Sequence, residues 1–113
     1  MCLRMLSYSK VSLDEEEGFE KIENFVKGLG NLNVKIYEDN PITNKNVEAY
    51  KVFDNVEPYF FGREFHFGEN MLNLRVETST DTVVYIGTDE MLVRIPRGYK
   101  CAFTYYYFQK VNK

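Results

Sequence analysis

Apolar side chains between residues 12 and 29 recur every three or four positions, which is the spacing of one side of an α-helix. The stripe consists of Phe19, Ile22, Phe25, Val26 and Leu29. Ser12 and Glu15 have the spacing of a capping box, and acidic residues fill positions 14–17, where the helix dipole is positive. Gly30 suits the C-terminal cap. The pattern predicts one amphipathic helix over residues 12–29.

Most of the remaining chain alternates between apolar and polar residues, the pattern of half-buried strands. Clusters of Gly, Pro, Asn and Asp separate the alternating segments and predict turns, one of them over residues 87–90. The predicted strands span residues 2–11, 32–37, 47–53, 61–67, 72–76, 82–86, 91–95 and 99–111. Because the connections between the later strands are short, these strands are expected to run antiparallel to their neighbours.

The segment 99–111 is dense in aromatic and β-branched residues and contains no strand breaker. In an extended strand its side chains would divide between two faces. One face would carry Tyr99, Cys101, Phe103, Tyr105, Tyr107 and Val111, and the other Ala102, Thr104, Tyr106 and Phe108. Neither face is polar, so we expect both to pack against other parts of the molecule.

The aromatic content determines the expected architecture. The chain has nine Tyr and nine Phe but no Trp. One helix about 10 Å across covers roughly half of one face of a sheet about 25 Å wide, so the rings need further cover. A curled sheet, a second copy of the chain or a binding partner would each supply that cover, and we expect the first. The prediction is a single α+β domain over residues 1–113, with an N-terminal amphipathic helix packed on a twisted, mostly antiparallel sheet of about six to seven strands that curls toward a partial barrel.

Charge and hydropathy limit the expected location and partners. The net charge is −3, yet the last twenty residues combine Arg94, Arg97, Lys100, Lys110 and Lys113 with no acidic residue. No stretch approaches the roughly 18 apolar residues that suggest a membrane span, and the first residues lack the features of a secretory signal. We therefore expect a cytoplasmic protein that does not contact a membrane.

His66 is the only histidine, and Glu64 is the only local carboxylate that could orient it as a base. No second His or Cys pair stands at metal-ligand spacing, so no metal and no cofactor are expected. Cys2 and Cys101 form no disulfide framework; we expect reduced thiols, with a single bridge between the two as the alternative. The favoured role of His66 is that of an exposed strand residue.

The start Met1-Cys2-Leu3-Arg4 resembles that of the class II glutamine amidotransferases over these few residues. The resemblance implies that Cys2 would be an N-terminal nucleophile, with its own amine as the base. The fold of that family needs two stacked sheets with helices on both outer sides, more than 113 residues can hold. We prefer a structural role for Cys2 and keep a small hydrolase or amidotransferase as the third alternative.

The remaining candidate site combines cations with aromatic rings near the C-terminus. Its members are Arg94, Arg97, Lys100, Tyr105, Tyr106, Tyr107 and Phe108. Tyr and Arg dominate the anchors of protein interfaces, and such a surface does not require a positive net charge. The first hypothesis is therefore a non-catalytic protein that recognises another protein through this sheet face, with a second copy of the chain as an alternative partner. Single-stranded nucleic acid, with bases stacked on the rings, is the second hypothesis.

Overall fold

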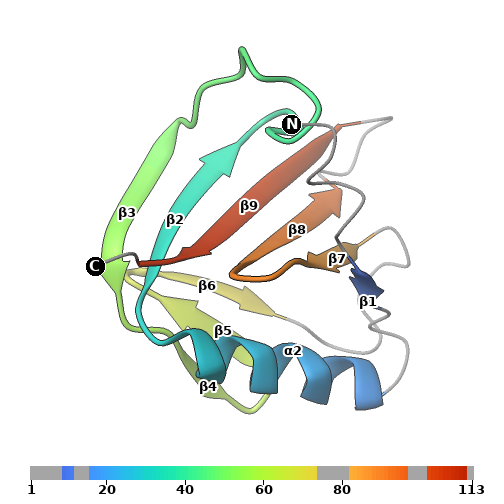
Figure 1. Ribbon diagram of the computed structural model, residues 1–113, viewed down its shortest axis with the longest axis vertical. Helices are drawn as coiled ribbons and strands as arrows, with labels where there is room; N and C mark the ends of the chain where they lie inside the picture. Colours follow the sequence, from blue (N-terminus) through green and yellow to red (C-terminus); the bar gives the residue numbers. More distant parts are fainter. Residues whose placement is uncertain (1–8, 12–15, 74–81, 97–101, 112–113) are drawn as a thin grey trace.

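A computed structural model describes residues 9–11, 16–73, 82–96 and 102–111 of the chain. It contains one helix, a six-stranded sheet and a three-stranded sheet (Figure 1). The helix is α2 (Glu16–Leu29), and the strands are β1 (Ser9–Val11), β2 (Leu32–Tyr37), β3 (Lys51–Val56), β4 (Tyr59–Phe61), β5 (Glu64–Phe67), β6 (Asn70–Asn73), β7 (Val83–Ile86), β8 (Glu90–Pro96) and β9 (Phe103–Lys110). The α+β prediction is confirmed.

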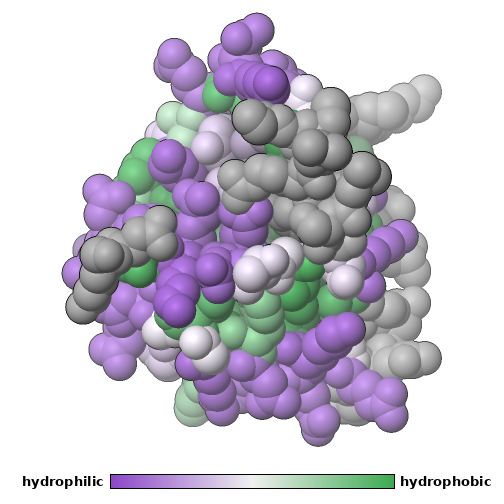
Figure 2. Space-filling view, in the orientation of Figure 1, coloured by the Kyte–Doolittle hydropathy of each residue, from purple (hydrophilic) through white to green (hydrophobic). Residues whose placement is uncertain are grey.

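The helix α2 lies along one side of the molecule with its apolar stripe turned inward (Figure 1). Phe19, Ile22, Val26 and Leu29 are buried, as their helical spacing predicts. Figure 2 shows hydrophilic residues on the outward side of the helix and hydrophobic residues along the side that meets the sheets. Gly30 follows with a φ of 79°, the left-handed conformation of a helix C-terminal cap. The predicted capping box at residues 12–15 lies outside the described residues.

The six-stranded sheet has the order β1-β7-β8-β9-β2-β3, and every neighbouring pair is antiparallel. β9 lies at its centre, paired with β8 on one side and β2 on the other (Figure 1). The register places Val34, Phe108 and Met91 in one cross-strand row. The predicted strand 47–53 is displaced, because residues up to Tyr50 belong to the connection and β3 continues to Val56.

The three-stranded sheet is a meander of β4, β5 and β6. The prediction of one strand over residues 61–67 is wrong, because the chain reverses at Gly62-Arg63 between β4 and β5. A second two-residue turn, Gly68-Glu69, joins β5 to β6. Gly62 and Gly68 have φ values of 62° and 63°, and a glycine with positive φ at the first position is the mark of a type II′ hairpin turn.

The small sheet lies beside α2, and together they cover one face of the large sheet (Figure 1). Phe65 and Phe67 of β5 each lie with their ring centroids 5.1 Å from that of Phe108 in β9. Phe60 of β4 meets Phe19 of the helix edge-on, with centroids 5.9 Å apart. The described strands form no closed barrel. A second sheet, and not closure of the large one, supplies the additional cover for the rings.

Part of the opposite face of the large sheet is covered by the connection between β2 and β3. Ile42 from this connection is buried together with Tyr37, Leu92 and Tyr107 of the sheet. The connection is held by Asp39, whose carboxylate accepts hydrogen bonds of 2.8 Å from the backbone N–H of Asn40 and from Nδ2 of Asn44. These bonds, first that from Asn44, lower the pKa of Asp39 below its ordinary value.

Candidate functional site

The binding residues predicted near the C-terminus do not share one surface. Tyr105 and Tyr107 point to the face covered by the β2–β3 connection, whereas Tyr106 and Phe108 point to the helix and the small sheet. This division follows from the period of two along a strand. Arg97 and Lys100 lie outside the described residues, as do Cys2 and Cys101.

Two of these side chains have almost no surface left for a partner. Phe108 is 0% exposed and Tyr107 is 8% exposed, because each packs in a core on its own side of β9. Tyr106 is half-buried against Phe67, with ring centroids 6.2 Å apart. The aromatic density of β9 therefore serves the packing of the two faces, with Tyr107 and Phe108 buried and Phe103, Tyr105 and Tyr106 half-buried.

Arg94 and Tyr105 are opposite each other on β8 and β9 and form a small polar cluster. The Arg94 guanidinium lies 4.3 Å from the centroid of Phe103, a cation–π contact. Burial raises the pKa of Tyr105, while the positive charge of Arg94 acts in the opposite direction. Nε of Arg94 is buried and has no hydrogen-bond partner among the described residues. The cluster is half-buried, so only part of the Arg94 side chain is accessible to a partner.

Three of the five exposed large apolar side chains of the described residues lie elsewhere, on the outer face of the small sheet. Phe61 is 72% exposed, Tyr59 58% and Met71 45%. Alternate residues of the same three strands, Phe60, Phe65, Phe67 and Leu72, face the core. We call Tyr59, Phe61, Glu64, His66 and Met71 the outer patch.

Strand register fixes the geometry of the outer patch. Tyr59 is opposite His66, and His66 is opposite Met71, so these three form one cross-strand row. Phe61 and Glu64 are opposite each other in the next row, which Asn73 completes on β6. The rings of Tyr59 and His66 are stacked, with centroids 4.6 Å apart and planes 5° from parallel. His66 Nε2 lies 3.1 Å from Glu64 Oε1, which links the two rows.

The Glu64–His66 pair brings together the two groups that the sequence suggested as a base and its orienting carboxylate. Within the described ranges, no Ser, Thr or Cys forms a hydrogen bond with His66. No three His, Cys, Asp or Glu side chains of the described residues come together as metal ligands. In this geometry the pair orients the imidazole ring under Tyr59.

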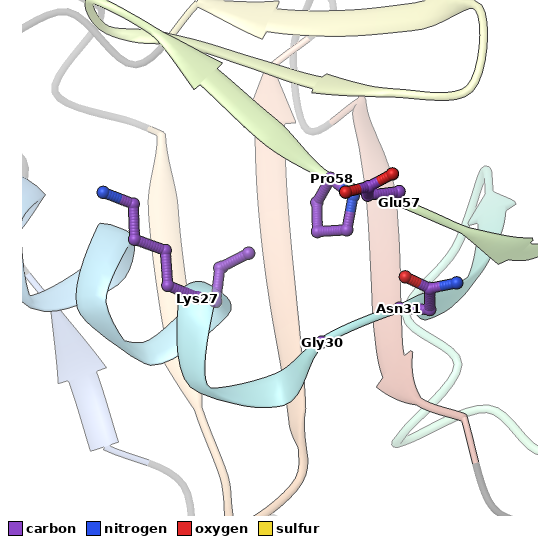
Figure 3. Close-up of a pocket in the computed structure, with 6 residues that line it drawn as sticks. Lys27, Gly30, Asn31, Glu57 and Pro58 are labelled. Carbon is purple, nitrogen blue, oxygen red and sulfur yellow. The ribbon is translucent and has the colours of Figure 1, made fainter.

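A hollow of about 200 Å³ lies where the end of α2 meets the connection between β3 and β4 (Figure 3). It is lined by Val26, Lys27, Gly30, Asn31, Glu57 and Pro58. Its volume is below the roughly 300–1,000 Å³ of typical small-molecule sites. Lys27 Nζ is already 3.0 Å from Oε2 of Glu23. The outer patch is therefore the stronger candidate site.

Comparison with known proteins adds no assignment. No family model matches the chain, and neither a curated protein nor a solved structure is similar enough to count as a match. Among the described residues, no helix has the length and apolar character needed to cross a membrane.

The sequence does contain one signal for the outer patch. Gly62-Arg63 and Gly68-Glu69 are two-residue hairpin loops with glycine in first place, flanked by apolar and aromatic residues. If residues 61–67 form one strand, Phe61 shares a face with Phe65, which is buried. The turn at Gly62 instead places Phe61 on the face of Glu64, and the exposed patch follows from that reversal.

Proposed function

We propose that this protein is a non-catalytic binding protein that holds a short segment of another protein on the outer patch. The observation that carries the proposal is the exposure of Tyr59, Phe61 and Met71 together on one face of an ordered sheet. A sheet that buries one face normally carries polar side chains on the other. Burying one such side chain is worth about 1.5–3 kcal/mol, so leaving three in water favours a partner that covers them.

The size of the patch favours a short segment over a second copy of the chain. Three strands about 4.8 Å apart and about four residues long, at about 3.3 Å per residue, give a face of roughly 10 by 13 Å. A stable interface between folded proteins buries about 800 Å² on each partner, several times this area. A peptide of a few residues fits the patch without further contacts.

Nucleic acid receives less support as the partner. The outer patch contains Glu64, whose carboxylate would repel a phosphate backbone. The basic and aromatic surface considered on β9 has lost Tyr107 and Phe108 to the core. Recognition of a protein segment is not opposed by the Glu64 carboxylate, and it does not require the Tyr107 and Phe108 side chains.

The test is a selection of nine-residue random peptides displayed on phage, with the native protein as target. Peptides that bind are synthesised, and their affinities are measured in solution against the native protein and the double variant Tyr59→Ser/Phe61→Ser. We expect at least a tenfold loss of affinity in the double variant, since it lacks two rings that the bound peptide would cover.

Tyr50→Ser is the matched control, because Tyr50 is also 58% exposed but lies outside the outer patch. This variant should bind the peptides as the native protein does. Failure to enrich any peptide, or equal binding by the double variant, would overturn the proposal.

A further inference from the structure

We infer that the segment bound by the outer patch carries a positively charged side chain, seated against the Phe61 ring and the Glu64 carboxylate. The inference rests on the proposed function and names the chemistry of the partner. It depends on how the rings, the carboxylate and the cations of the small sheet are distributed.

Phe61 and Glu64 are directly opposite each other in the β4–β5 ladder. Side chains in such a pair have their Cβ atoms about 5 Å apart on the same face of the sheet. Phe61 is the most exposed large apolar side chain described, and the Glu64 side chain is 37% exposed. An aromatic face beside a carboxylate attracts a cation through both the ring quadrupole and the full negative charge.

Among the described side chains, only one oxygen of the Glu64 carboxylate has a partner. Its Oε1 is paired with His66 Nε2 at 3.1 Å, and its Oε2 has no hydrogen-bond partner among the described residues. The outer patch therefore has an acceptor that a partner can use.

The nearest cation in the sequence is directed elsewhere. Arg63 follows directly after the turn glycine, but its guanidinium lies 4.5 Å from the centroid of Phe19 in α2. The remaining charged residues of the small sheet and its entry, Glu57 and Glu69, are acidic and exposed. Apart from Arg63, the charged residues described between positions 57 and 73 are thus complementary to a positive group, and they disfavour phosphate or an acidic segment.

The experiment uses the peptides selected against the native protein. We expect them to carry Arg or Lys next to apolar residues. Replacing that Arg by citrulline, or that Lys by acetyl-lysine, removes the charge and keeps the shape. Each replacement should weaken binding by the native protein about tenfold, as for a charge that contacts both a carboxylate and a ring.

Two variants assign the effect to named side chains. In Glu64→Gln and in Phe61→Leu, the difference between charged and neutral peptides should fall to about twofold. Both positions are at least partly exposed, and unfolding midpoints equal to that of the native protein would establish that the variants are folded.

The outcomes separate the two proposals. Selected peptides that lack Arg and Lys, or that bind equally well in neutral form, would refute the inference and leave the proposed function standing. A selection that yields no binding peptide would remove both.

Discussion

The phenol of Tyr107 in β9 donates a 2.6 Å hydrogen bond to Oε1 of Glu90 at the start of β8, and both side chains are buried. Glu90 is opposite Gln109 and Leu92 is opposite Tyr107, so the bond crosses the ladder diagonally. A buried carboxylate is costly unless it is hydrogen-bonded, and this contact offsets part of that cost. It joins the two central strands on the face covered by the β2–β3 connection.

Tyr107→Phe should lower the free energy of unfolding by about 1–3 kcal/mol, because it removes a donor from a buried carboxylate. Urea denaturation followed by circular dichroism measures the change. Tyr105→Phe is the control, since Tyr105 lies on the same face and its hydroxyl has no hydrogen-bond partner among the described residues. Equal effects of the two variants would show that the Glu90 contact contributes nothing.

Phe108 and Phe61 should differ sharply in their effect on stability. Phe108→Ala leaves a cavity between β9, the small sheet and the helix, and should cost about 3–5 kcal/mol. Phe61→Ala changes an exposed ring and should stay within about 0.5 kcal/mol. The same urea experiment checks both. A large loss in Phe61→Ala would mean that the outer patch has a structural role, contrary to the exposure of its rings.

Gly68→Ala should destabilise the protein more than Gly62→Ala. Both glycines have positive φ, so alanine adds a strain of about 1–2 kcal/mol at either position. At Gly68 the added Cβ would also lie 2.9 Å from Cδ2 of Phe53, whereas nothing lies within 4 Å at Gly62. The extra cost of Gly68→Ala should be about 1 kcal/mol or more. Equal thermal midpoints would mean that the Phe53 ring moves aside freely.

Tyr106 should make the fold sensitive to alkaline pH. Burial raises the pKa of Tyr106 above its ordinary value of 10.0, and the nearby Tyr50 raises it further. The unfolded chain therefore loses this proton at lower pH than the folded chain does. The resulting contribution to stability is complete below pH 10 and is lost as the pH rises through the folded pKa.

Tyr106→Phe should therefore reduce the slope of the free energy of unfolding against pH above pH 10. Tyr37 and Tyr105, whose pKa values burial also raises, would cause the slope that remains. Urea midpoints measured at several pH values on both sides of 10 provide the test. An unchanged alkaline slope in the variant would exclude Tyr106 as a source.

The parts of the fold that local pattern determines were predictable. The apolar stripe of α2 and the alternation in β2 determine which side chains face the core, so periodicity alone locates these two elements. The length and composition of β9 likewise indicated a strand packed on both faces. Glu90 was different, because Gly87-Thr88-Asp89-Glu90 predicts a turn, yet Glu90 opens β8 and is buried. The burial of the Glu90 side chain is supported by its hydrogen bond from Tyr107, which is seventeen residues away in the sequence.

The candidate site was not predictable from period alone. Phe61 and Phe65 are four residues apart, and either a strand or a hairpin accommodates them. Only the reversal at Gly62 places one ring in solvent and the other in the core. For Tyr106, Tyr107 and Phe108, an aromatic run indicates burial or binding equally well, and only tertiary contacts distinguish the two.

The central position of β9 also affects the order in which the chain can fold. Within the large sheet, β1-β7-β8 and β2-β3 are joined to each other only through β9, which follows all of them in the chain. During synthesis, both halves emerge from the ribosome before the strand that joins them. Until β9 pairs with them, the edges of β8 and β2 that it will join are unpaired. Aggregation or chaperone binding would compete with folding during this interval.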